Sequence, residues 1–272
     1  MRTRGISRTL LGLFAAVCCL AWGEPLRVVA TTSHLAALVR AIGGTDVSVT
    51  TIIPAGMCPG HFDMRPADRY SVEKGSLILA HGWETVLPGI ESSTRQGAVR
   101  RVSVEGNWLV PSVQKEAGRS VAFLLSEALP RRASFFSANL QRHLAEMDRL
   151  EKDALTRIET AGLKGVPVIC QDMVAPFLSF LGMKVAATYG REEELTPSAL
   201  AALVKTGRQA NVRLIVDNLQ AGPKAGVSLA RELGIPRATV SNFPGGMPRT
   251  DSVAACVHDN ISRLISAYAS RH

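Results

Sequence analysis

The stretch RRASFFSANLQRHLAEMDRLEKDALTRIETA, residues 131–161, decides the fold. It contains no proline and no glycine, it is rich in alanine, leucine, glutamate and arginine, and Gly162 follows it. These features predict one uninterrupted helix, which at 1.5 Å per residue would be about 45 Å long. A helix of that length exceeds the width of a small lobe, so we expect residues 131–162 to form a rigid connection between two lobes.

Short apolar, β-branched runs alternate with helical patterns on both sides of this stretch. The expected strands before it are Leu26–Ala30, Val47–Ile53, Leu77–Ala80 and Arg101–Val104, and those after it are Val166–Ile169, Val185–Ala187, Leu214–Val216 and Ala238–Val240. An order of strand, helix, strand favours parallel pairing. We therefore predict an α/β fold with an N-terminal lobe (residues 24–130) and a C-terminal lobe (residues 163–272), each a mainly parallel sheet flanked by helices.

Residues 1–23 have the pattern of a secretory signal peptide. Residues 1–9 are basic, Leu10–Trp22 is apolar but too short to span a bilayer, and small residues precede Glu24. We therefore expect the mature chain in the periplasm or another extracytoplasmic space. Lipid anchoring at Cys18 is an alternative that we favour less, because Val17 is a poor residue before a lipidated cysteine.

The composition narrows the function classes. The chain is 46% hydrophobic and 20% charged, which is typical of a folded globular protein. Its net charge of +8 comes from basic residues scattered through helical stretches, without a basic run interleaved with aromatic residues, so we expect no nucleic-acid partner. Five cysteines in 272 residues are too few for a disulfide scaffold. We expect a monomer.

Candidate ligand residues cluster after the expected strands. A parallel sheet binds its ligand beyond the carboxyl ends of its strands, and the residues found there are rich in imidazole, thiol and amide groups. They are His34, Cys58, His61, His81, Asn107, Cys170, Gln171, Asp172 and Asn242. Imidazole, thiolate and carboxamide groups bind transition-metal ions. His34 stands alone at a helix start, where we expect a capping or packing role.

Several motifs resemble a known family. They are Val28-Val29-Ala30-Thr31-Thr32, Ile53-Pro54-x-Gly56, Pro59-x-His61, Pro66-Ala67-Asp68, Trp108-Leu109-x-Pro111 and Thr196-Pro197. In this order, over essentially the whole mature chain, they are similar to the periplasmic zinc- and manganese-binding proteins, the solute receptors of metal-ion ABC importers. The resemblance implies two lobes around a backbone helix, one transition-metal ion held between them, and delivery of that ion to a membrane ABC permease.

The chain departs from the family pattern at the ligands. The family takes His, His, His or Glu, and Asp or Glu from four loops, and these positions fall here on Gly60, Gly106, Gln171, and Asn242 or its neighbour. The resemblance keeps His61, one residue after Gly60, as the surest ligand. We expect further residues to line the site, namely His81, Asn107, Gln171 and Asn242. Asp172 is expected to orient a neighbouring side chain.

Our hypothesis is that softer donors have replaced the usual ligands. Cys58 and Cys170 flank His61 and Gln171 on opposite lobes, and four methionines stand nearby in the sequence, Met57, Met64, Met173 and Met247. This set favours Zn²⁺ or Cu⁺ over the Mn²⁺ that some family members bind, and Zn²⁺ is the expected cargo. Alternatively, Cys58 and Cys170 form a disulfide across the cleft.

Two rival functions stay open. The same fold could carry a metal chelate or a small organic ligand, since the usual metal ligands are replaced. The chain could also be an enzyme with Cys170 as nucleophile and His61 or His81 as base. The sequence contains no G-x-S-x-G, P-loop or H-E-x-x-H motif and no acid placed to orient either histidine. We therefore predict capture and release of an ion, without catalysis.

Overall fold

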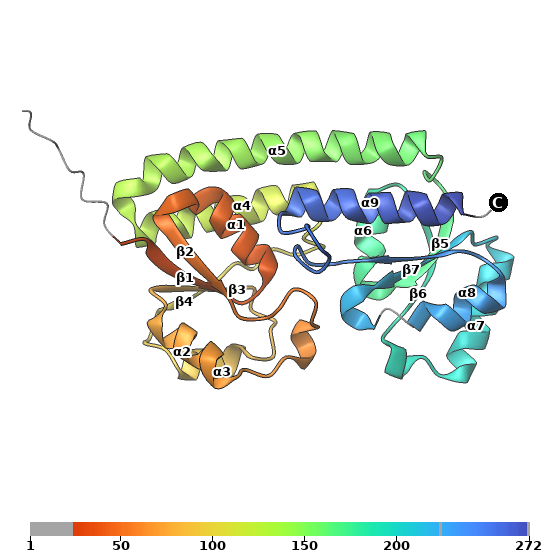
Figure 1. Ribbon diagram of the computed structural model, residues 1–272, viewed down its shortest axis with the longest axis horizontal. Helices are drawn as coiled ribbons and strands as arrows, with labels where there is room; N and C mark the ends of the chain where they lie inside the picture. Colours follow the sequence, from red (N-terminus) through yellow and green to blue (C-terminus); the bar gives the residue numbers. More distant parts are fainter. Residues whose placement is uncertain (1–23, 223–224, 271–272) are drawn as a thin grey trace, which may run out of the picture.

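The computed structural model describes residues 24–222 and 225–270. The expected signal peptide and its Cys18 lie outside the described residues. The described chain forms two lobes with one long helix across both of them (Figure 1), which confirms the predicted α/β class. In this part of the chain, no helix is both long enough and apolar enough to cross a membrane.

The N-terminal lobe holds a parallel four-stranded sheet in the order β2-β1-β3-β4. Its strands are β1 (Leu26–Ala30), β2 (Val47–Thr51), β3 (Leu77–Ala80) and β4 (Val99–Arg101), and its helices are α1 (Ser33–Gly43), α2 (Pro66–Lys74), α3 (Leu87–Ser92) and α4 (Pro111–Ala128). Figure 1 shows α1 and α4 on one side of the sheet and α2 and α3 on the other. Because side chains alternate along a strand, Val28 packs in the core with α1 and α4, whereas Val29 packs in the core with α2 and α3.

The C-terminal lobe repeats this arrangement in the order β6-β5-β7-β8, again with all pairs parallel. Its strands are β5 (Pro167–Gln171), β6 (Lys184–Tyr189), β7 (Leu214–Asn218) and β8 (Arg237–Val240), and its helices are α6 (Ala175–Phe180), α7 (Pro197–Gln209), α8 (Ala225–Leu233) and α9 (Val253–Ala269). Short 3₁₀ helices interrupt the loops of both lobes: η1 (Gly44–Asp46), η2 (Pro59–His61), η3 (Pro130–Arg132), η4 (Asp172–Val174), η5 (Glu192–Glu194) and η6 (Leu219–Ala221).

The long helix α5 (Ala133–Thr160) belongs to both lobes. Its buried residues recur every three or four positions, the spacing of one helix face: Phe136, Asn139, His143, Met147, Leu150, Ala154 and Ile158. Phe136 lies in the core of the N-terminal lobe and Leu150 in the core of the C-terminal lobe. A single helix that contributes to both cores links the two lobes, as the sequence predicts.

Two elements differ from the sequence prediction. β4 lies at Val99–Arg101 and not at Arg101–Val104, because Ile78 of β3 pairs with Val99. Apolar residues occur on both sides of Arg100 and Arg101, so the sequence pattern allows several registers and only the pairing selects one. The short helix α3 has no counterpart in the prediction, since Pro88 and Gly89 within it are more typical of a turn.

Each sheet contains one point at which the chain changes direction. From β1 the chain moves to β2 on one side, and from β2 it crosses to β3 on the other side, so the carboxyl ends of β1 and β3 border a crevice. The carboxyl ends of β5 and β7 border the equivalent crevice of the C-terminal lobe. Ligands of open parallel sheets bind at such switch points, so the loops that follow these four strands position the candidate site.

Candidate functional site

A cavity of about 690 Å³ lies between the two lobes. The N-terminal lobe contributes His34, His81, Trp83, Asn107 and Trp108 to its lining, and the C-terminal lobe contributes Asp172, Met173, Asn242 and Phe243. These residues lie in or just after the loops at the carboxyl ends of β1, β3, β4, β5 and β8. The cavity therefore occupies the place where two sheets of this kind bind a ligand.

The two histidines lie at the switch point of the N-terminal sheet. Thr32 caps α1 because its side chain accepts from the backbone N–H of Leu35 at 3.5 Å, and His34 falls in the first turn of that helix. His81 directly follows β3, and its Nε2 lies 2.8 Å from the hydroxyl of Thr32. One threonine thus contributes both to the start of α1 and to the orientation of the His81 ring.

Both imidazoles are buried and neutral. Burial lowers the pKa of His34 from 6.5 to about 3, with a smaller contribution in the same direction from His81, while the hydrogen bond to Asn242 opposes the shift. Burial likewise lowers the pKa of His81 to about 3. Since Nε2 of His34 donates to the carbonyl oxygen of Asn242 at 2.8 Å, its Nδ1 carries a lone pair. The buried Nδ1 atoms of His34 and His81 have no hydrogen-bond partner among the described residues.

Aromatic side chains surround these imidazoles. The Trp108 indole meets His81 edge-on at 4.2 Å between ring centroids and His34 at 5.8 Å. Trp83 stacks on His81 at 5.0 Å, and Phe243 of the other lobe packs on His34 at 5.0 Å. The Trp83 side of the cavity is open, because that residue is 57% exposed. The cavity thus has a wall rich in aromatic carbon, and the two histidines of its lining each keep a buried, unpartnered nitrogen atom.

A buried carboxylate holds the loop that carries His81 and Trp83. Glu84 accepts hydrogen bonds from the backbone N–H groups of His81 and Gly82, each at 2.8 Å, and from the hydroxyl of Thr31. Its side chain is almost fully buried, so these donors replace the water that the carboxylate loses. The sequence pattern did not single out Glu84, which positions the site without lining the cavity.

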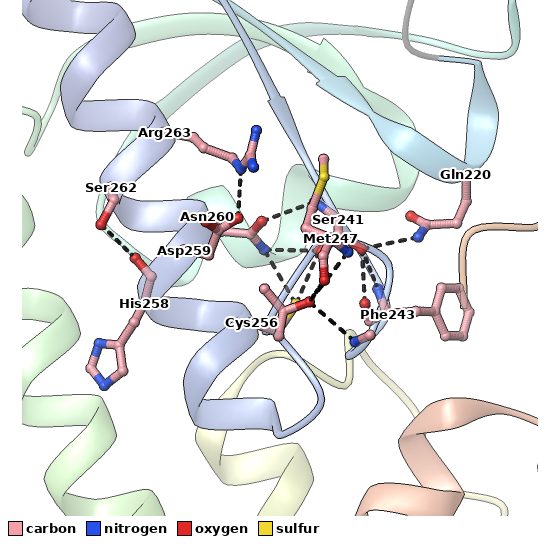
Figure 2. Close-up of polar contacts among 12 residues, drawn as sticks. Gln220, Ser241, Phe243, Met247, Cys256, His258, Asp259, Asn260, Ser262 and Arg263 are labelled. Atoms are coloured by element: carbon pink, nitrogen blue, oxygen red, sulfur yellow. Dashed lines mark hydrogen bonds and ion pairs between the residues drawn. The ribbon is translucent and has the colours of Figure 1, made fainter. Parts of the chain in front are cut away.

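In the C-terminal lobe, a network centred on Ser241 positions Asn242 (Figure 2). The carboxamide of Asn260 on α9 accepts from the Ser241 backbone N–H at 2.9 Å and donates to its carbonyl oxygen at 2.8 Å. The Gln220 side chain donates to the Ser241 hydroxyl at 3.0 Å and accepts from the Asn242 backbone N–H at 2.9 Å. The loop after β8 is thereby fixed against both α9 and η6.

Hydrogen bonds join the lobes around the cavity. The carboxamide of Asn107 donates to Oδ1 of Asn242 at 2.7 Å and to the carbonyl oxygen of Met173 at 2.9 Å. His34 donates to the Asn242 carbonyl, and Gln220 donates to the carbonyl oxygen of Ala55 at 2.6 Å. Because all four bonds connect the N-terminal lobe to the C-terminal lobe, they hold the cleft in a closed arrangement.

The structure brings together only part of the predicted site. His81, Asn107, Asp172 and Asn242 line the cavity, as does Met173 among the four methionines. Gln171 lies outside that lining, because its Oε1 accepts from the Met173 backbone N–H at 2.9 Å and from the Asn218 side chain at 3.2 Å. His34, expected to be a cap or packing residue, packs against Trp108 and Phe243 and also lines the cavity. Its position after the first strand of the sheet was the available signal.

His61 and Cys58 form a separate cluster with Arg191 of the C-terminal lobe. The Arg191 guanidinium donates to the Cys58 sulfur at 2.7 Å and contacts the exposed His61 ring, with Nη1 3.2 Å from Nε2. A side chain at Gly60, the first ligand position of the family, would meet this guanidinium, since its Cβ would lie 3.4 Å from Nη2. A fixed positive charge therefore stands beside the place where the family pattern puts a metal ligand.

The disulfide between Cys58 and Cys170, considered as an alternative, is not formed. Both residues are free thiols, and Cys170 is fully buried in the core of the C-terminal lobe. Burial, with a smaller contribution from the nearby Asp172, raises the pKa of the Cys170 thiol to about 12. A thiol that is buried and protonated suits neither a metal ligand nor a nucleophile.

The described residues contain no ready-made protein cage for a metal ion. Within residues 24–222 and 225–270, no group of three or more His, Cys, Asp or Glu side chains is arranged to hold one. The potential donors in the cavity lining are the two buried imidazoles, the amides of Asn107 and Asn242, and the carboxylates of the exposed residues Glu105 and Asp172.

A sequence model of the family described as zinc-uptake complex component A, periplasmic, matches residues 28–267. This chain belongs to that family. Its relatives are substrate-binding proteins of ABC transporters, which confirms the prediction of a binding protein and corrects the rival reading of Cys170 as a catalytic nucleophile. The family description also agrees with the predicted extracytoplasmic location.

Individual relatives are distant in sequence. The metal ABC transporter substrate-binding lipoprotein SloC of Streptococcus mutans is 23% identical over 260 residues, which cover 85% of each chain. The manganese ABC transporter substrate-binding lipoprotein PsaA of Streptococcus pneumoniae is 25% identical over 221 residues, covering 70% of this chain and 71% of the relative. Both relatives are named lipoproteins. The candidate lipidation site of this chain, Cys18, lies outside the described residues.

Solved structures share the fold. The crystal structure of ZnuA superposes with a TM-score of 0.78 at 17% identity and covers 90% of this chain and 100% of that chain. The periplasmic zinc-binding protein TroA from Treponema pallidum gives a TM-score of 0.76 at 19% identity, covering 90% and 99%. At these identities the superpositions establish the fold of this family member and not its cargo.

Proposed function

We propose that this protein is the solute-binding component of an ABC importer, that it captures a transition metal in the cavity between its lobes, and that it delivers the metal to a membrane permease. One observation carries the proposal: His34 and His81 line the cavity as buried, neutral imidazoles, and each keeps an unpartnered Nδ1. A neutral imidazole nitrogen is the commonest protein ligand for transition metals.

The donor set bears on which metal is carried. Imidazole suits zinc, copper and nickel, whereas manganese prefers carboxylate and water oxygen. The cavity offers the two imidazoles together with the amides of Asn107 and Asn242, so we propose Zn²⁺ as the favoured ion, with Cu⁺ and Mn²⁺ as alternatives. Related proteins are named for manganese and for iron, and those names describe the relatives alone.

The sequence predicts His61, Cys58 and Gln171 as further ligands, and we favour the buried pair over them. Arg191 beside His61 and Cys58 disfavours a bare cation there, since like charges at hydrogen-bond distance repel. We therefore propose that His34 and His81 hold the metal and that His61 and Cys58 help to join the lobes through Arg191.

The test is metal analysis of the purified chain 24–272 without a polyhistidine tag. Elemental analysis of the protein as isolated comes first, followed by calorimetric titration of the metal-free protein with Zn²⁺, Mn²⁺ and Cu⁺. His34→Ala and His81→Ala should each weaken binding at least tenfold, while the surface variant His258→Ala should match the unchanged protein. Absence of bound transition metal in both measurements, or equal binding by all variants, would overturn the proposal.

A further inference from the structure

The inference rests on the proposed function and concerns the form in which the metal arrives. We propose that the cargo is a complex of a divalent metal ion with a small amine-carboxylate chelator, and that Nδ1 of His34 and Nδ1 of His81 fill coordination positions that the chelator leaves open. The chain then supplies two ligands and the cavity that accepts the organic part.

The number of protein donors is the first argument. Zinc sites take four ligands, of which at least three come from the protein when the ion is bound bare. The described residues offer no group of three His, Cys, Asp or Glu side chains for an ion, and the cavity contains two imidazoles with a free nitrogen. Two protein donors hold a bare ion only weakly, but they are sufficient for a metal that already carries its other ligands.

The other nitrogen of each ring is anchored in the way that metal-ligating histidines require. Nε2 of His34 donates to the Asn242 carbonyl oxygen at 2.8 Å, which fixes the tautomer with a lone pair on Nδ1. Nε2 of His81 lies 2.8 Å from the Thr32 hydroxyl, which can accept from it. Metal-bound histidines use such contacts to hold the ring in place and to set the tautomer.

The size and the walls of the cavity argue for an organic component. A volume of about 690 Å³ lies in the range of small-molecule sites, which is roughly 300–1,000 Å³, and far exceeds the space of a single ion. Trp83, Trp108 and Phe243 form much of its wall, and Met173 is 58% exposed beside it. A bare ion would leave this apolar surface unused, whereas the carbon skeleton of a chelator would cover it.

Charge selects the class of chelator. The buried polar residues that line the cavity, His34, His81 and Asn107, bring no carboxylate to balance a divalent ion. The carboxylates of the lining, those of Glu105 and Asp172, belong to exposed residues. Burying an unbalanced charge is costly, so the complex that enters should be close to neutral. A chelator with two carboxylates and an amine gives that balance with a divalent ion and leaves positions open for imidazole.

The experiment compares Ni²⁺ alone, the neutral Ni²⁺–iminodiacetate complex, and iminodiacetate alone, by equilibrium dialysis against tag-free chain 24–272. The complex should bind at least tenfold more tightly than the free ion. Ni²⁺–EDTA, in which the chelator occupies the coordination positions, serves as the control and should not bind.

Variants identify the ligands. His34→Ala and His81→Ala should each weaken binding of the complex at least tenfold, and His61→Ala should change it less than twofold. His34→Gln is a second variant, because glutamine can keep the hydrogen bond to the Asn242 carbonyl while it lacks the imidazole; it should lose binding as the alanine variant does.

The outcomes separate this inference from the proposed function. If free Ni²⁺ binds through His34 and His81 as tightly as the complex does, the inference fails and the metal-binding function stands. If iminodiacetate alone binds as tightly as the complex, the cargo is organic and both fail. Binding of the complex that is unaffected by His34→Gln and His81→Ala would also overturn the inference.

Discussion

The two lobes have the same strand order but fill their switch points differently. In the N-terminal lobe, His34 and His81 border the crevice between β1 and β3, and each ring keeps an Nδ1 without a partner among the described residues. In the C-terminal lobe, Gln171 and Asn218 border the crevice between β5 and β7, and the Asn218 side chain donates to Gln171 Oε1 at 3.2 Å.

The comparison shows that the strand order creates a crevice in each lobe, whereas the side chains at the crevice decide whether polar atoms there stay without partners. Gln171 also accepts from the Met173 backbone N–H, and Asn218 accepts from the Gln220 backbone N–H at 3.3 Å, so the C-terminal crevice is closed by its own hydrogen bonds. That crevice supports the loops carrying Met173 and Asn242. In the N-terminal crevice, by contrast, the Nδ1 atoms of His34 and His81 have no hydrogen-bond partner among the described residues.

The largest expected effect is on the stability of the C-terminal lobe. Asp217, at the end of β7, is fully buried and accepts from Tyr189 at 2.5 Å, from the Gly226 backbone N–H at 2.7 Å and from Arg237. Asp217→Ala should lower the free energy of unfolding by about 3–5 kcal/mol, because it breaks a buried ion pair. For a chain of this size the melting temperature should fall by about 10 °C.

The exposed Asp251→Ala is the matched control for Asp217→Ala and should change the free energy of unfolding by less than about 0.5 kcal/mol. If Asp217→Ala left thermal unfolding unchanged and abolished metal binding, the C-terminal switch point would be the ligand site and the comparison would be reversed.

The next largest effect distinguishes a structural role of the C-terminal switch point from a ligand-binding role of the N-terminal one. Gln171→Ala removes the partner of the Met173 N–H and of Asn218, which should cost about 1–3 kcal/mol of stability. It should change metal affinity less than twofold, whereas His34→Ala should change it at least tenfold. Urea unfolding and calorimetric titration measure the two quantities. Equal losses of affinity in both variants would show that the crevices share the ligand.

A smaller effect is expected from the contacts between the lobes. Asn107→Ala removes donors to Asn242 and Met173 of the opposite lobe. Losing these bonds should weaken metal binding about fivefold, close to 1 kcal/mol, because the closed arrangement becomes less favourable. Titration measures the affinity and small-angle scattering the dimensions of the metal-free protein. Unchanged affinity would mean that the remaining contacts close the cleft by themselves.

The smallest effect concerns a histidine outside both crevices. His143 on α5 is buried against α4, and burial lowers its pKa below the ordinary value of 6.5. The unfolded chain binds the proton more readily, so stability is full above pH 6.5 and decreases as the pH falls below it. His143→Gln should make the free energy of unfolding less dependent on pH between 7 and 5, as measured by denaturant unfolding at each pH, without changing metal affinity. If His143→Gln left the pH dependence of the free energy of unfolding unchanged, His143 would not contribute to that dependence.

Local patterns carried much of the fold prediction. The absence of glycine and proline in 131–161 sets the helix, and the apolar runs mark all strands except β4, whose register depends on pairing with β3. Because strand ends of parallel sheets meet at one edge, the sequence also pointed to His81, Asn107 and Asn242. It could not show that Gln171 turns to Asn218, since that pair is 47 residues apart in the chain.

The sequence by itself determined the family, the two parallel sheets and the helix between them, because these depend on short motifs and on hydrophobic periodicity. Only the tertiary structure decided which donors face the cavity. His34 and His61 both follow strands in the sequence, yet the folded lobes bury His34 against Trp108 and Phe243 and leave His61 exposed beside Arg191. Burial, charge and available partners come from residues distant in the chain, so no local pattern encodes them.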